Sequence, residues 1–126
     1  MEERFPIKSI FFSEFHQSLG PCLTYQVPED GADHISKEMF DAISVYIIPK
    51  PDVQGTVVTV NALGFKIVGY PVAISNKKYP RNFLMFNLCF VCRSKARTVQ
   101  FEPVVKKLAE YLVTLEVSFF VTDLIF

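Results

Sequence analysis

The run "IKSIFFSEF" carries apolar side chains on both faces of the β-strand that its alternation predicts. Ile7, Phe11 and Phe15 would share one face, and Ile10 and Phe12 would share the other. A strand with one solvated face keeps polar residues on that face, so apolar residues on both faces indicate burial from both sides. We therefore expect this strand to lie in the centre of its sheet.

Two hairpins are expected, one on each side of a helical segment. Gly20 indicates a turn. The following residues 22–27 alternate between apolar and other side chains, and they would form a strand that pairs with the first one. Farther along, residues 55–60 and 65–74 form β-rich runs joined by "NALG", a short connection that ends in glycine. Pro71 lies inside the second of these runs and indicates an edge, a bulge or a break there.

Residues 83–92 form the most apolar run of the chain, "FLMFNLCFVC". One face would carry Leu84, Phe86, Leu88 and Phe90, and the other would carry Phe83, Met85 and Val91. Apolar residues on both faces again predict a central strand. We interpret these side chains as core rather than as the lining of a ligand cavity.

Two segments repeat apolar residues at helical spacing. The first is residues 35–47, which follow the candidate caps Asp33 and Ser36 and stop at the prolines of "PKP". The second begins near Pro103. Its apolar stripe would be Val104, Leu108, Leu112 and Leu115, opposite Lys106, Lys107 and Glu110. We expect this stripe to lie on the sheet.

The expected order of elements is therefore strand, strand, helix, three strands, helix (ββαβββα). This order predicts an α+β fold in which a five-stranded, mostly antiparallel sheet is flanked by helices. A chain of 126 residues fits one such domain and leaves little room for a second core.

The charged residues balance, with 13 Lys and Arg against 13 Asp and Glu. This balance offers no net field for nucleic acid or an anionic membrane, so we expect no nucleic-acid partner. No window reaches 18 uninterrupted apolar residues, and "MEERFP" lacks the basic-then-apolar pattern of a signal peptide. We therefore expect a soluble, intracellular chain with no transmembrane segment.

The motifs of a stand-alone enzyme are missing from the sequence, which has no phosphate-binding glycine loop, no H-E-x-x-H and no G-x-S-x-G. Cys89 and Cys92 form a C-x-x-C, but positions i and i+3 of a strand face opposite sides, so structural thiols are favoured over a zinc or redox site. His16 could activate Ser18 or Cys22, but a lone histidine in a hairpin is more often a polar turn residue.

The stretch "NKKYPRN" at residues 76–82 places three cationic residues directly before the most apolar run. Its ordinary interpretation is a solvated turn between two strands. Composition alone gives no reason to prefer a binding or catalytic loop at this point.

Several long blocks of sequence resemble the amino-terminal domain of the nitrogen permease regulator-like protein two family. The blocks are "IFFSEFHQSLGPCLTYQVPED", "ISKEMFD", "VYIIPKP", "NKKYPRNFLMFNLCFVC" and "EPVVKKLAEYLVTLE", and they extend from about residue 7 to residue 116. The resemblance implies a longin-type domain, in which the first and fifth strands lie centrally. That arrangement agrees with the strands that the alternation makes apolar on both faces.

The resemblance also implies a set of partners. Family members pair through this domain with a sibling, the regulator-like protein three, inside a GATOR-type complex that also contains a large DEP-domain subunit. The complex acts as a GTPase-activating protein toward a Rag GTPase and restrains target-of-rapamycin signalling when amino acids are scarce. We would then expect a cytoplasmic chain that is recruited to the surface of the lysosomal or vacuolar membrane.

The residue that matches the family's arginine finger is Arg81. The partner GTPase holds the GTP and Mg²⁺, so this chain would need no cofactor or metal of its own and would not be a stand-alone enzyme. A guanidinium inserted in trans neutralises the charge that builds on the γ-phosphoryl and leaving oxygens. Arg81 as a solvated turn residue remains the alternative.

The other residues of the stretch would support this role. Lys77 and Lys78 are flexible point charges that suit the steering of an anionic partner surface. Tyr79, Pro80 and Asn82 would support the loop, and the proline stiffens the approach to the arginine.

The resemblance is weak after Glu116. We therefore place the longin-like domain at residues 1–116 and expect residues 117–126 to be a divergent apolar tail, in a chain that is truncated relative to the family. A single domain lacks the subunit contacts that would position Arg81. The alternative function is a non-catalytic module that pairs with the sibling through an exposed strand edge and an apolar surface.

Overall fold

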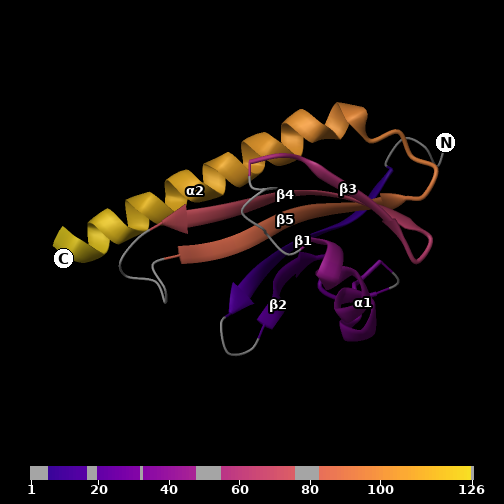
Figure 1. Ribbon diagram of the computed structural model, residues 1–126, viewed down its shortest axis with the longest axis horizontal. Coiled ribbons are helices and arrows are strands. Elements are labelled where there is room, and N and C mark those ends of the chain that lie inside the picture. The colour runs from indigo at the N-terminus through magenta and orange to yellow at the C-terminus, as the bar shows by residue number, and fades with distance from the viewer. Residues whose placement is uncertain (1–5, 17–19, 32, 48–54, 76–82, 126) are drawn as a thin grey trace.

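The computed structural model describes residues 6–16, 20–31, 33–47, 55–75 and 83–125. Its centre is a five-stranded antiparallel sheet with the strand order β2-β1-β5-β4-β3. The strands are β1 (Ile7–His16), β2 (Gly20–Val27), β3 (Val58–Ala62), β4 (Phe65–Ser75) and β5 (Phe83–Arg93). Helix α1 (Lys37–Ile47) covers one face, and α2 (Glu102–Ile125) lies along the other after a 3₁₀ turn at Val99–Phe101 (Figure 1).

Both strands that were expected to be central are central, because β1 lies between β2 and β5, and β5 lies between β1 and β4. The core has two layers. On the α1 face it includes Phe11, Phe40, Ile43, Ile47, Ile67, Cys89 and Val91. On the α2 face it includes Val68, Tyr70, Leu88, Phe90, Cys92, Val105 and Ala109. The expected ββαβββα order and the α+β, longin-like fold are confirmed.

A β-bulge at Lys8 changes the face on which Ile7 lies. The register of β1 against β5 shifts between Ile7 and Ser9, so Lys8 is the extra residue. An extra residue reverses the alternation of a strand. Ile7 accordingly packs with Ile10 on the α2 face, whereas Phe11 lies on the α1 face. The expectation that Ile7 and Phe11 share a face is therefore wrong.

The turn between β3 and β4 is shorter than expected. Asn61 and Ala62 still belong to β3, and Leu63 and Gly64 alone make the turn, with φ of 54° and 79°. Positive φ at both positions is typical of the two-residue hairpin turn that matches the twist of paired strands. β3 therefore begins three residues later and ends two residues later than the expected run 55–60.

Pro71 lies within β4 and does not interrupt it. In a two-residue hairpin, alternate residues of β4 from Phe65 to Gly69 direct their backbone N–H and C=O groups toward β3, and Pro71 continues this alternation. β3 stops pairing at Gly69, and the Pro71 carbonyl accepts a hydrogen bond from the Gly55 N–H at 3.2 Å. The N–H that proline lacks would thus not have bonded to β5. Of the three alternatives, the structure shows an edge position.

Helix α1 begins at one of its two candidate caps. Ser36 Oγ accepts a hydrogen bond from the backbone N–H of Met39 at 3.1 Å, as an N-cap residue does. Asp33, the other candidate, instead forms an ion pair with Lys8, with 3.4 Å between Asp33 Oδ1 and Lys8 Nζ. The helix starts at Lys37, two residues later than the pattern predicted.

Helix α2 packs against β4 and β5 through a stripe that shares only Leu112 with the expected one, since Leu115 is also exposed. Val105 and Ala109 are fully buried, and Leu112 is partly buried beside them, whereas Val104 and Leu108 are 46% and 44% exposed. Both sets repeat every three to four residues, so spacing alone does not choose between them. The small side chain of Ala109 lets the helix approach the sheet closely.

The remaining features of α2 bear on two other expectations. The helix continues without interruption from Glu102 to Ile125, through the expected domain boundary at residue 116, and that boundary stays a prediction. Within the described ranges, no helix combines the length and apolar character that a membrane crossing would need.

Candidate functional site

The stretch that the sequence singles out lies outside the described residues. It contains Lys77, Lys78, Tyr79, Pro80, Arg81 and Asn82. The structure does describe the strands that bound this stretch. β4 ends at Ser75, β5 begins at Phe83, and these two residues are partners across the ladder. The connection at residues 76–82 is therefore anchored at both ends by adjacent, hydrogen-bonded strands.

The strands behind this connection are closely packed. Asn87 is buried on β5, and its Nδ2 donates a hydrogen bond to the carbonyl oxygen of Ile47, the last residue of α1, at 2.6 Å. Cys89 Sγ donates to Asn87 Oδ1 at 3.3 Å. On β4, a Cβ atom added to Gly69 would lie 2.7 Å from Asn87 Oδ1, so only glycine fits there without a shift. These contacts fix the hairpin to α1, which is the rigid support that a functional loop requires.

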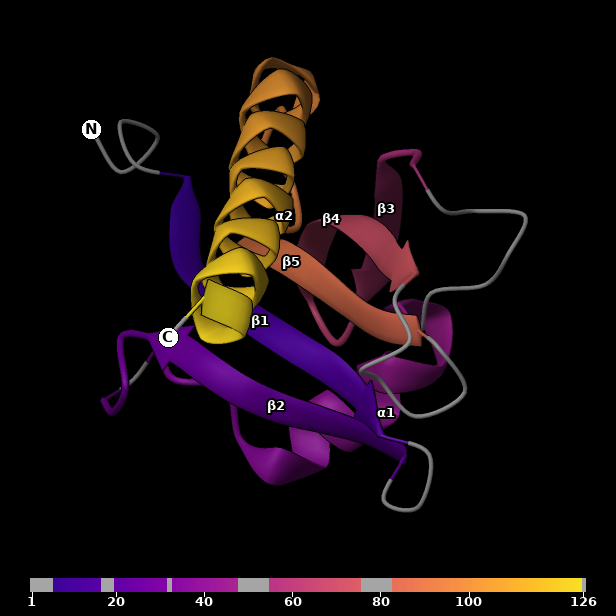
Figure 2. The same ribbon diagram turned by 90° about the vertical axis from the view of Figure 1, so that its left-hand side faces the viewer.

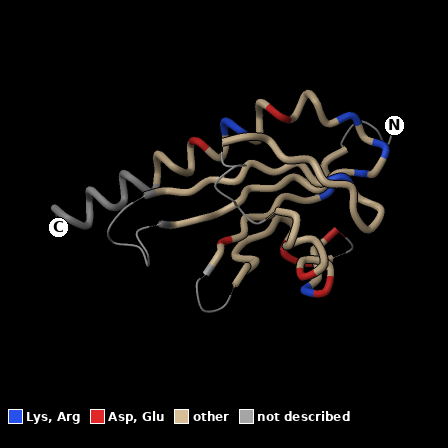
Figure 3. The backbone as a smooth tube through the Cα atoms, viewed as in Figure 1, with Lys and Arg blue, Asp and Glu red and all other residues tan. Residues whose placement is uncertain are grey.

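The described residues of the two strands add no charge at this end of the hairpin. The described stretches of the two strands, residues 67–75 and 83–92, contain no charged side chain. Lys66 and Arg93 lie at the opposite end of the hairpin. Figure 3 shows blue Lys and Arg segments near that end of the sheet. At about 3.3 Å per residue, the length of β5 separates Arg93 from Phe83 by roughly 33 Å.

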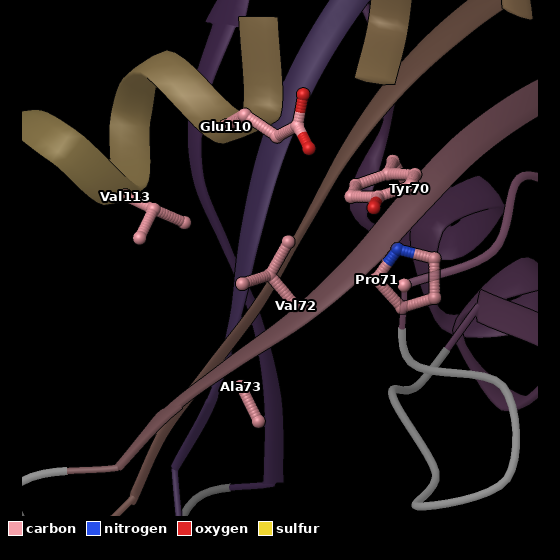
Figure 4. A pocket seen from close by; sticks show the side chains of 7 residues that line it. Tyr70, Pro71, Val72, Ala73, Glu110 and Val113 are labelled. Carbon is pink, nitrogen blue, oxygen red and sulfur yellow. The ribbon is translucent and has the colours of Figure 1, made fainter. Parts of the chain in front are cut away.

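A groove of about 380 Å³ lies between β4 and α2. Its lining consists of Gly55, Tyr70, Pro71, Val72, Ala73, Glu110 and Val113. Figure 4 shows Glu110 and Val113 on α2 above the strand that carries Tyr70 and Val72. The sequence pattern did not predict this groove. The one available signal was that the run 65–74 is longer than its hairpin partner.

A second groove, of about 310 Å³, lies over the other half of the same sheet face. It is lined by Ile10, Phe11, Phe12, Tyr25, Gln26, Val27, Leu88 and Leu112. Tyr25 and Val27, both on β2, are 71% and 69% exposed. Contiguous exposed apolar residues of this kind are typical of association surfaces.

The two cysteines of the C-x-x-C face opposite sides of β5, as the alternation predicted. Cys89 belongs to the core on the α1 face, and Cys92 belongs to the core on the α2 face. Burial raises the pKa of both thiols, although the charge of Lys66 opposes the rise at Cys92. A thiol that stays protonated is a poor nucleophile and a poor metal ligand. Among the described residues, no group of three or more His, Cys, Asp or Glu could hold a metal ion.

The alternative nucleophiles near the first hairpin have little support. Ser18 lies outside the described residues. Cys22 is a free thiol of intermediate exposure, and its Sγ donates to the carbonyl oxygen of Gly20 at 3.6 Å. His16 ends β1, opposite Gly20. The interpretation of His16 as a polar turn residue stays a prediction.

Comparison with known proteins gives a consistent result. The model of the nitrogen permease regulator 2 family matches residues 5–123. The chain is 58% identical over 111 residues to the GATOR complex protein NPRL2 of Drosophila melanogaster, covering 87% of this chain and 26% of that protein. It is 34% identical over 111 residues to nitrogen permease regulator 2 of Saccharomyces cerevisiae, covering 88% of this chain and 18% of that protein.

A third relative extends the comparison. The nitrogen permease regulator 2 homolog of Schizosaccharomyces pombe is 30% identical over 113 residues, covering 86% of this chain and 28% of that protein. The chain thus spans between about a fifth and a little over a quarter of the length of these relatives. The family match covers nearly the whole chain, and the chain therefore belongs to the nitrogen permease regulator 2 family.

Proposed function

We propose that this chain is a subunit of a GATOR-type complex that activates a Rag GTPase, and that Arg81 acts as an arginine finger in the active site of that GTPase. The observation that carries the proposal is the 58% identity to a protein named as a GATOR complex component. The anchoring of residues 76–82 between two central, closely packed strands supports it.

The proposed chemistry is electrostatic. The GTPase supplies the phosphate loop, the GTP and the Mg²⁺, and the arginine adds positive charge where negative charge develops in the transition state. Arginine suits this task because it is always charged and presents several N–H donors in a plane. Lys77 and Lys78 would raise the rate of encounter with an acidic surface of the partner, and Tyr79, Pro80 and Asn82 would hold the loop.

The wider setting belongs to the same proposal. The chain would pair with a regulator-like protein three sibling and with a large DEP-domain subunit. It would act at the lysosomal or vacuolar membrane surface and restrain target-of-rapamycin signalling on amino-acid starvation. It would need no cofactor of its own and would have no enzymatic activity alone.

The test is multiple-turnover GTP hydrolysis by the Rag pair in the presence of the complex assembled with this chain. Arg81→Ala should remove about 10³- to 10⁵-fold of the stimulation, and Arg81→Lys should restore little, because a point charge does not replace a planar donor. Arg97→Ala is the matched control, since Arg97 is exposed and follows the far end of β5. Full stimulation by Arg81→Ala would refute the role of this arginine.

A second function, a non-catalytic assembly module, is favoured by the apolar groove that contains Tyr25 and Val27. On this alternative, Arg81→Ala and the unmodified chain would stimulate hydrolysis equally. Tyr25→Ser with Val27→Thr would instead prevent co-purification with the sibling. Arg81→Ala therefore separates the two functions, because both include pairing with the sibling and only the first needs the arginine.

A further inference from the structure

Among the described residues, no strand covers the outer edge of β4 along its second half. β3 pairs with β4 from Phe65 to Gly69, while β4 continues to Ser75. Gly55, which precedes β3 in the chain, donates one backbone hydrogen bond to the Pro71 carbonyl. Past Pro71, no described strand pairs with this side of β4. An edge of this kind presents unpaired backbone groups that can bond to another strand.

The alternation of the strand fixes which backbone groups face outward. Residues from Phe65 to Gly69 bond to β3 at every second position, and Pro71, Ala73 and Ser75 continue that series. The N–H and C=O of Ala73 therefore point away from β5 and toward the outer edge of the sheet. The intervening residues, Val72 among them, bond to β5.

The groove between β4 and α2 lies directly beside this edge. Tyr70, Val72 and Val113 give it apolar walls, and Glu110 contributes a carboxylate (Figure 4). Within the described part of the chain, this carboxylate has no hydrogen-bond or ion-pair partner, and no cation lines the groove. A ligand of the groove would therefore combine apolar contact with a positive charge.

We propose that the Val72–Ser75 edge of β4 adds an extended segment of a partner protein as a sixth strand, with a Lys or Arg of that segment opposite Glu110. In strand addition, main-chain hydrogen bonds supply affinity, and pockets for alternate side chains supply specificity. Here Ala73 supplies the main-chain groups, and the groove supplies the pocket. This site does not depend on the proposed role of Arg81.

The probe for the test is an acetylated and amidated seven-residue peptide. It has threonine at its odd positions and valine, lysine and valine at its even positions, so one face is apolar with a central cation. A second peptide carries glutamate in place of the lysine. Binding to the 126-residue chain is followed by the amide chemical shift of Ala73 and by the slowing of its hydrogen exchange.

Two variants separate the parts of the site. Ala73→Pro removes the outward N–H without loss of a bond to β5 and should weaken binding of the lysine peptide about tenfold. Thr59→Pro is the matched control, because Thr59 also faces outward but lies on β3, and it should leave binding unchanged.

Glu110→Lys should weaken binding of the lysine peptide about threefold to fivefold and strengthen binding of the glutamate peptide by a similar factor. Asp41→Lys makes the same charge change on α1 and should affect neither.

Several outcomes would overturn the proposal. Equal binding by Ala73→Pro and the unmodified chain would show that no strand is added at this edge. Equal binding of the two peptides would remove the role of Glu110. Concentration-dependent dimers that disappear with Ala73→Pro would identify a second copy of this chain as the occupant in place of a basic segment.

Discussion

The two faces of the sheet are closed to different degrees. On the α1 face, the side chains of Phe11, Phe40 and Ile43 are almost completely buried. On the α2 face, the helix packs against β4 and β5, and Tyr25 and Val27 on β2 stay exposed. Figure 2 shows α1 and α2 on opposite sides of the sheet, with β2 beside β1 at its edge. Closed packing stabilises the fold, whereas an open apolar surface is available for association.

The helices explain this difference. α1 is short but directs large apolar residues at the sheet, and Phe40 packs edge-on against Phe11 with 5.9 Å between ring centroids. α2 is much longer but meets the sheet through the narrow stripe of Val105, Ala109 and Leu112. A long helix with a narrow buried stripe covers few strands, so part of the sheet face stays open.

The largest expected effect on stability comes from comparing two neighbouring residues of β1 that lie on opposite faces of the sheet. Phe11→Ala should lower the free energy of unfolding by about 3–5 kcal/mol, because it empties the closed core. Phe12 faces the open side and contacts Phe86, with 4.9 Å between ring centroids, so Phe12→Ala should have about half that effect. Urea unfolding of both variants measures the difference. Equal losses would mean that the two faces are equally well packed.

The two buried thiols give a second contrast, in the dependence of stability on pH. Burial raises the pKa of Cys89 in the folded state, so above the ordinary thiol pKa of about 8.5 the unfolded chain ionises first and the folded chain binds more protons. This contribution to stability is therefore complete below about pH 8.5 and is lost as pH rises. The maximum loss is about 1.4 kcal/mol per pH unit.

Urea unfolding between pH 8 and pH 10 measures that slope. Cys89→Ala should reduce it more than Cys92→Ala, because the charge of Lys66 opposes the pKa rise at Cys92. An unchanged slope in Cys89→Ala would show that other groups control stability in this range.

A third contrast lies within α2. Val105→Ala should lower the free energy of unfolding by about 1–2 kcal/mol, since Val105 is fully buried against the sheet. The neighbouring Val104→Ala should change it by less than about 0.5 kcal/mol. Thermal or urea unfolding distinguishes the two. The reverse order would restore the stripe of Val104 and Leu108 that the sequence pattern predicted.

The same positions show how far sequence reasoning reaches in this protein. Burial of β1 and β5 from both sides could be predicted because it leaves apolar residues at consecutive positions. The face on which Ile7 lies could not be predicted, because no residue type at Lys8 marks the β-bulge there. The buried stripe of α2 could not be predicted either. The stripe with Val104 and Leu108 and the stripe with Val105 and Ala109 have the same spacing, and only tertiary packing chooses between them.

The candidate site shows a similar division. Arg81 was selected by resemblance to a family, since composition favoured a solvated turn. The groove beside Tyr70 and Glu110 was not predicted, because it depends on the unequal lengths of β3 and β4 and on the rotation of α2. Chemistry that depends on how elements pack has no local sequence pattern.

The smallest expected effect on stability belongs to the open face. Tyr25→Ser with Val27→Thr should change the free energy of unfolding by less than about 0.5 kcal/mol, because both side chains are largely exposed in the folded chain. The same double variant should clearly reduce the binding of an apolar fluorescent dye, which reports exposed hydrophobic surface. Val45→Thr on α1 is a matched control, since Val45 is exposed but lies apart from this groove. A loss of several kcal/mol in the double variant would mean that β2 contributes to the core, and the open half of the α2 face would then be structural rather than a surface for association.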